Sequence, residues 1–223
     1  MANFDKVPLP DYTRAEDTVN SVTHYVGVPM TLAFTFLLLK KLRFAPTGMQ
    51  TAALIIYTLC MLILYFGSGY YHGLKPSYKK RVARVLDHSN IFVMISGTLT
   101  AFNLMAAINK TPRLAVSVTV VMWIISVIGI YFTFKDLHRF RKVQMAMYII
   151  MGWSALATVI PMIVSGGEAE KKLIIYVLGG GIAYTVGAVL YGIGKKIRYI
   201  HAVFHVFILA GSVIQFIGFY HYL

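Results

Sequence analysis

Two histidines near the C-terminus, His201 and His205, are four positions apart in the sequence. In an α-helix this spacing places both imidazoles on one face, where they can bind the same metal ion. Ser68 and His72 have the same spacing in an earlier segment, and Asp87 occurs in a third. These residue types are those of a metal centre with a hydroxyl group and a carboxylate beside it.

Three neutral imidazoles, from His72, His201 and His205, suit zinc and leave a fourth coordination position open for water. Zinc can lower the pKa of such a water to about 7. Asp87 could hydrogen-bond to the water, orient a histidine or accept a proton during attack. The sequence therefore predicts a Zn²⁺ site with these three ligands, and with Asp87 and Ser68 as its catalytic groups.

Simpler interpretations of the same polar residues stay open. Ser68 could bond only to a carbonyl of its own helix. His88 points about 100° away from Asp87 around a helix, which favours a structural hydrogen bond. Haem is disfavoured, because two histidines on one helix face cannot be opposite axial ligands of one iron. Four further polar residues could have no other role than to cap the first helix, as Asn often does: Glu16, Asp17, Asn20 and His24.

The composition identifies the elements that must position these groups. Of 223 residues, 58% are hydrophobic and only 13% are charged, and the mean hydropathy is +0.69. Such values exclude a disordered chain, a coiled coil and an ordinary soluble enzyme. The single Cys excludes a disulfide framework.

A membrane-spanning helix needs about 20 mostly apolar residues. Runs of that kind predict an all-α bundle of seven transmembrane helices, at 22–39, 48–72, 86–108, 113–134, 143–165, 172–193 and 199–222. Residues 1–21 form a short polar segment, and residues 22–223 form the membrane domain. Segments on one side of the membrane contain twice as many Lys and Arg residues as those on the other. The positive-inside rule then predicts a cytoplasmic N-terminus and a C-terminus outside, in the cell membrane.

The candidate site residues agree in depth. His72 ends the second run, Asp87 opens the third, and His201 and His205 open the seventh, so all fall near the predicted cytoplasmic face. Ionisable residues inside membrane spans are costly and usually mark function. The net charge of +13 predicts contact with anionic membrane lipid rather than with nucleic acid, because no nucleic-acid-binding motif accompanies it.

Four separated motifs resemble those of the hemolysin III-like proteins, which belong with the progestin and adipoQ receptors in a superfamily shared with the alkaline ceramidases. The resemblance covers essentially the whole chain and looks like the bacterial branch. The motifs are Glu16-Asp17-Thr18-Val19-Asn20 followed by Thr23-His24, Ser68-Gly69-Tyr70-Tyr71-His72, Leu86-Asp87-His88-Ser89, and His201-Ala202-Val203-Phe204-His205.

This resemblance implies an intramembrane zinc on His72, His201 and His205, with Ser68 and Asp87 next to the zinc-bound water. In the receptor and ceramidase relatives, the site is associated with hydrolysis of the ceramide amide bond. Our first hypothesis is therefore a zinc-dependent hydrolase of a lipid amide or ester drawn from the cytoplasmic leaflet.

Two alternatives remain. The second hypothesis is a non-enzymatic sensor or membrane-homeostasis protein with structural zinc, which perturbs membranes when overproduced. A proton- or ion-coupled transporter ranks last, because the ionisable residues do not continue across the bilayer. The sequence leaves the lipid substrate and the oligomeric state open.

Overall fold

The computed structural model describes residues 4–42, 48–193 and 197–223, and within these ranges it contains helices and no strands. The elements are η1 (Phe4–Lys6), α1 (Arg14–Tyr25), α2 (Gly27–Leu42), α3 (Gly48–Gly73), α4 (Tyr78–Met105), η2 (Ala107–Asn109), α5 (Pro112–Asp136), α6 (Arg141–Trp153), α7 (Leu156–Ser165), α8 (Glu168–Ile193) and α9 (Ile200–Tyr222). Across the described residues they form 7 stretches long and apolar enough to cross a membrane, which confirms the predicted seven-helix bundle.

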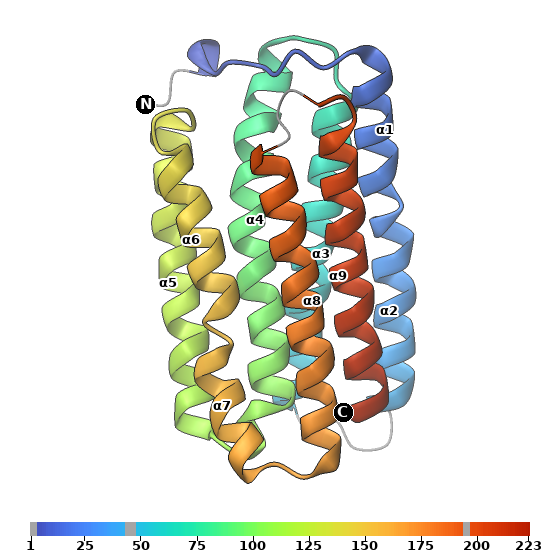
Figure 1. Ribbon diagram of the computed structural model, residues 1–223, viewed down its shortest axis with the longest axis vertical. Helices are drawn as coiled ribbons and strands as arrows, with labels where there is room; N and C mark the ends of the chain where they lie inside the picture. The colour runs from blue at the N-terminus through green and yellow to red at the C-terminus, as the bar shows by residue number, and fades with distance from the viewer. Residues whose placement is uncertain (1–3, 43–47, 194–196) are drawn as a thin grey trace.

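The helices run up and down along one axis, with the two chain termini at opposite ends (Figure 1). Helix α4 occupies the centre, and α3, α5 and α6 pack around it. Helices α8 and α9 pack along each other, and α1 lies against α3 and α9. The end of the bundle that carries the N-terminus therefore holds the last turns of α3, α5 and α8 and the first turns of α1, α4, α6 and α9 (Figure 1).

The first helix begins earlier than the apolar pattern predicts. Helix α1 starts at Arg14, and Thr13 is its N-cap. The side chains of Thr13 and Glu16 each accept a hydrogen bond from the other's backbone N–H, which forms a capping box. Asn20 therefore lies inside the helix and does not cap it, whereas Glu16 does take part in the cap. Four polar residues after Glu16 are buried inside the bundle as part of the first span: Asp17, Asn20, Ser21 and His24.

Two of the seven spans are each divided into two α-helices. Helices α1 and α2 separate at Val26, and Pro29 lacks the N–H that would bond to the Tyr25 carbonyl one turn earlier. Helices α6 and α7 separate at Ser154 and Ala155, upstream of Pro161, where the backbone changes to i→i−3 hydrogen bonds. The helical hydrogen bonding of this span is therefore interrupted about two turns before the proline.

Glycine allows α1 and α2 to approach α3 closely. A Cβ atom on Gly69 would lie 2.8 Å from the ring of Tyr25, and one on Gly27 would lie 2.3 Å from the ring of Tyr65. Any larger residue would separate these helices. Small residues act in the same way in α8, where a Cβ on Gly187 would lie 2.8 Å from Phe207 of α9. Gly187 of α8 thus packs within the bundle, against α9.

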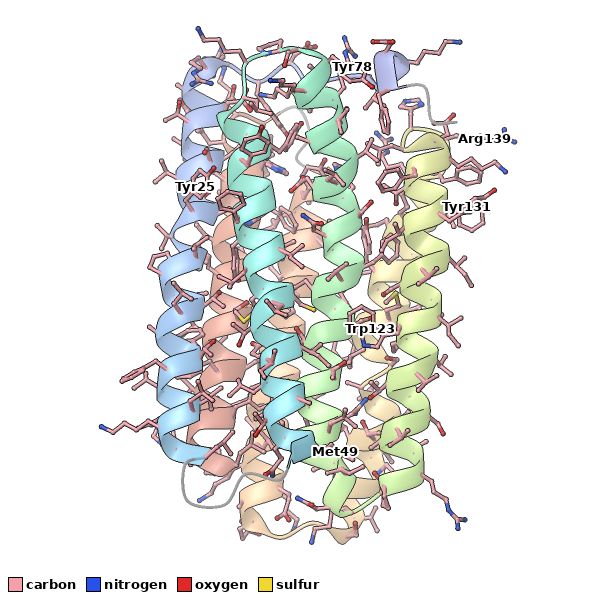
Figure 2. All side chains as sticks on the ribbon, turned by 180° about the vertical axis from the view of Figure 1, so that it is seen from behind. Tyr25, Met49, Tyr78, Trp123, Tyr131 and Arg139 are labelled. Carbon is pink, nitrogen blue, oxygen red and sulfur yellow. The ribbon has the colours of Figure 1, made fainter. Side chains whose placement is uncertain are left out.

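The outer flank of the bundle is apolar, as a lipid-facing surface requires. Large hydrophobic side chains such as Val164, Ile193 and Ile175 are exposed there. Figure 2 shows that nitrogen-tipped side chains gather at the two ends, with Tyr25, Tyr78 and Tyr131 toward the N-terminal end and Met49 at the other. Aromatic residues of this kind concentrate at membrane–water interfaces.

Candidate metal centre

The three predicted ligands meet at the N-terminal end of the bundle. His72 lies in the last turn of α3, and His201 and His205 lie in the first two turns of α9. All three are buried, and one ligand atom from each lies within 4.8 Å of the others. The Nε2 atom of His201 is 3.0 Å from Nε2 of His72 and 3.0 Å from Nε2 of His205.

This spacing fits a metal ion. A tetrahedral zinc with Zn–N bonds of 2.0–2.1 Å holds neighbouring ligand nitrogens about 3.3 Å apart. The Nε2 atom of His201 faces two other ring nitrogens, although a single N–H can point at only one of them. Convergence of three lone pairs on one point is the arrangement that a cation stabilises. The donor set therefore fits a metal ion bound through Nε2.

Hydrogen bonds on the far side of two rings hold the Nε2 atoms in place. Nδ1 of His72 lies 3.1 Å from Oδ1 of Asp17, and Nδ1 of His205 lies 3.1 Å from the carbonyl oxygen of Asn20. A carboxylate and a carbonyl accept hydrogen bonds, so we assign the ring proton to Nδ1 in both histidines. Each Nε2 then carries a free lone pair, as in carboxylate–histidine–metal sites.

The charge of Asp17 is balanced by a buried lysine. Lys80 of α4 donates to Oδ2 of Asp17 at 2.5 Å and to the Leu74 carbonyl at 2.9 Å. Only 3% of Lys80 is exposed. Lys80 lies outside the predicted third span, which was expected to begin at residue 86. Helix α4 begins instead at Tyr78, and Ser77 is its N-cap.

Tyr12 covers the histidine cluster from the N-terminal side. Its ring is stacked on that of His201, with centroids 5.5 Å apart, and lies 5.9 Å from that of His72. Burial raises the pKa of the Tyr12 phenol above its ordinary value, so the group stays neutral. Tyr12 and Lys80 were not predicted as site residues, because neither lies one helical turn from a predicted ligand in the sequence. Asp17 was considered only as a capping residue.

The two predicted catalytic residues line a cavity next to the cluster. Ser68 lies one turn before His72 on α3, and Asp87 lies on α4, where its Oδ2 is 3.7 Å from Nδ1 of His88. Within the described residues, no direct hydrogen bond joins either side chain to the three ligands. Nδ1 of His88 is 3.0 Å from the Arg84 carbonyl oxygen, which is the structural role expected for it.

The cavity has a volume of about 380 Å³. This lies within the range of about 300–1,000 Å³ that is usual for ligand pockets. Aliphatic and aromatic side chains from α4, α6, α8 and α9 form most of its wall. His201 and His205 lie at one end, and Gln215 lies about 15 Å further along α9, from the helical rise per residue. Arg141 and Lys142 also line it.

The sequence matches one family model and is similar to several known proteins along most of its length. The family model described as "Haemolysin-III related" matches residues 12–216. The hemolysin-3 homolog of Bacillus subtilis is 32% identical over 206 residues, which is 92% of this chain and 93% of that protein. Hemolysin-3 of Bacillus cereus is 29% identical over 90% of this chain and 89% of its own length. The human monocyte to macrophage differentiation factor is 23% identical over 75% of this chain and 69% of its own length.

Proposed function

This chain belongs to the haemolysin-III related family and is a multi-pass membrane protein, and we propose that it acts as a zinc-dependent hydrolase of a membrane lipid. The bond cleaved would be an amide or an ester next to an acyl chain. The observation that carries this proposal is the convergence of three imidazole nitrogens at one end of an apolar cavity. A metal centre beside a lipid-sized cavity inside a membrane suits chemistry on an acyl carbonyl.

Zinc bound there would polarise a carbonyl oxygen and make a bound water acidic near neutral pH. The residues of the chain divide the remaining tasks. His72, His201 and His205 would hold the ion, while Asp17 orients His72 and the Asn20 carbonyl orients His205. Asp87 would accept the proton of the attacking water, and Ser68 would hydrogen-bond to that water or to the developing oxyanion.

The proposed substrate is a lipid of the cytoplasmic leaflet. The histidine cluster lies at the end of the bundle that carries the N-terminus, and that end is also predicted to be the more basic one. Arg141 and Lys142 of the cavity wall are at the same end, because they open α6 next to the α5–α6 turn. A lipid could therefore place its head near the cluster while its acyl chain follows the cavity along α9.

The proposal is tested by metal analysis and lipid turnover on the purified full-length protein. We expect about one zinc per chain in the wild type and its loss in His205→Ala. The exposed His221→Ala variant is the matched control, and it should retain the metal. Metal-loaded protein should release fatty acid from an extracted bacterial lipid pool or from ceramide. A stable wild type without metal, or one that holds zinc and releases no fatty acid, would contradict the proposal.

A second candidate is a non-enzymatic sensor or homeostasis protein with structural zinc. It is favoured by the position of the ligands, which tie the end of α3 to the start of α9. Asp87→Asn separates the two functions, because Asp87 is not one of the three predicted ligands. If the protein is a hydrolase, Asp87→Asn should lower turnover by a factor of about 10²–10⁴. Loss of a cellular phenotype, with metal and stability retained, would then support hydrolysis. An unchanged phenotype would support the structural role.

A further inference from the structure

His24 of α1 is a fourth buried histidine at the centre, and the proposed reaction does not use it. Only 3% of its surface is exposed, and both Nδ1 and Nε2 lack a hydrogen-bond partner among the described residues. Asn20, one turn earlier on the same helix, is 1% exposed, and its amide nitrogen and oxygen also lack partners within those residues. Four side-chain polar atoms on one helix are thus buried without partners, although buried polar groups are normally bonded.

The surroundings of His24 show that it faces the cavity. Its ring is stacked on His205, with centroids 3.4 Å apart and planes 17° apart, and its edge contacts Tyr65. His24 lines the same cavity as Ser68 and Asp87. Among the described residues, the group that could hold a metal contains His72, His201 and His205 and excludes His24. Its nitrogens therefore need a partner other than the ion.

Packing alone does not account for a histidine at this position. A phenylalanine would make the same ring contacts with His205 and Tyr65 without burying two polar atoms. An unpaired buried donor or acceptor is destabilising, whereas an apolar group of the same shape is not. The cost is therefore offset only when something in the cavity bonds to the imidazole.

We propose that His24 is a hydrogen-bonding subsite for the polar head of a lipid in the cavity. A neutral imidazole has one N–H donor and one acceptor nitrogen. The ligand must then supply an acceptor and a donor together. An N-acyl amino alcohol does so through its C=O, N–H and O–H groups, whereas a simple fatty-acid ester offers acceptors only. This inference deepens the proposed function, and it rests on the cavity as the lipid site.

Ligand-induced stabilisation of the metal-loaded, full-length protein in nanodiscs tests this subsite. The probes are N-palmitoylethanolamine and methyl palmitate, which share one acyl chain and differ in the head. A ligand that binds only the folded protein raises the unfolding temperature, and at a given ligand concentration the rise is larger the tighter the ligand binds. We expect the amide to raise the unfolding temperature of the wild type by several degrees more than the ester does. In His24→Phe this difference should vanish, while metal content stays unchanged.

Two further variants make the result decisive. Without a probe, His24→Phe should be at least as stable as the wild type, because it removes the unpaired nitrogens. His24→Gln, which keeps a donor and an acceptor, should retain part of the preference for the amide even if the phenylalanine variant folds poorly. Thr98→Val is the matched control, since Thr98 lines the cavity while its hydroxyl bonds to the Met94 carbonyl in its own helix.

Equal shifts with both probes in the wild type, including no shift with either, would overturn the subsite. An amide preference that survives in His24→Phe would do so too. These outcomes differ from failure of the proposed function. Amide-selective binding without release of fatty acid would support the subsite and contradict the hydrolase. Fatty-acid release that His24→Phe leaves unchanged would support the hydrolase and contradict the subsite.

Discussion

The Oδ1 atom of Asp17 lies 3.1 Å from Nδ1 of His72, so a carboxylate in the first span orients a predicted metal ligand in the second. The other oxygen of the same carboxylate accepts a hydrogen bond from Lys80 of the third span. All three side chains are buried. This arrangement links α1, α3 and α4 at the cluster and pairs each buried charge with a partner.

Substitution of Asp17 is expected to weaken metal binding without removing a ligand. In Asp17→Asn, the amide oxygen can still accept from Nδ1 of His72, but the imidazole loses the basicity that a carboxylate confers. We predict a 10–100-fold loss of zinc affinity, as found for similar outer partners. Competition with a chelator of known affinity measures it. The exposed Asp11→Asn should leave the affinity unchanged.

The same substitution also leaves the Lys80 ammonium without its partner, and an unpaired buried charge costs about 3–5 kcal/mol. Asp17→Asn combined with Lys80→Met removes both charges. The double variant should regain most of the stability lost in the single one, while its zinc affinity stays low. Full recovery of zinc affinity in the double variant would show that Asp17 acts through folding alone.

Metal removal is expected to destabilise the bundle. The three ligands join α3 to α9, and an ion that binds only the folded state adds about 4 kcal/mol when its free concentration is 1,000 times Kd. Chelation should therefore lower the unfolding temperature of the wild type. His72→Ala should unfold at the same temperature with and without chelator. A wild type that chelator leaves unchanged would argue against a bound metal.

Gly69→Ala should separate α1 from α3, because the new Cβ would lie 2.8 Å from the ring of Tyr25. We predict a loss of about 1–3 kcal/mol in unfolding free energy, together with weaker metal binding, since Asp17 reaches His72 across this contact. Gly181→Ala in α8 is the control. A Cβ there meets nothing within 4 Å, so it should be neutral or slightly stabilising. Equal effects at both positions would contradict this account.

The orientation of the bundle is open to a direct test. The distribution of Lys and Arg predicts a cytoplasmic N-terminus and an external C-terminus. Alkaline phosphatase fused after Leu223 should then be active in a bacterial host, because the enzyme folds outside the cytoplasm. The same reporter placed in the turn between α5 and α6 should be inactive. The reverse pattern would move the histidine cluster to the outer leaflet.

Much of the molecule could be predicted from local patterns. Seven apolar runs identify the spans, because a helix in lipid must satisfy its backbone internally and cover about 20 residues with apolar side chains. His201 and His205 could be paired from their spacing within one helix. His72 could be added because it falls at a matching depth, and the structure brings its Nε2 atom to 3.0 Å from that of His201.

The start of the first span was predicted too late, although the sequence carries its signal. Thr13 and Glu16 form a capping-box signature that places the start of α1 correctly. The side of α1 that faces the cluster could not be predicted, because a polar segment has no apolar stripe that would identify its buried face.

Depth and helix periodicity are local properties of the chain, and they were enough to place three histidines near one membrane face. Which side chains touch them depends on how the helices rotate and cross, and that follows from close packing between distant segments. Asp17 reaches the cluster, and His24 reaches the cavity, because Gly27 and Gly69 let the first span pack directly on α3. Lys80 of α4 then bonds to Asp17, and Tyr12, just before α1, stacks on His201. These contacts were decided by the tertiary structure.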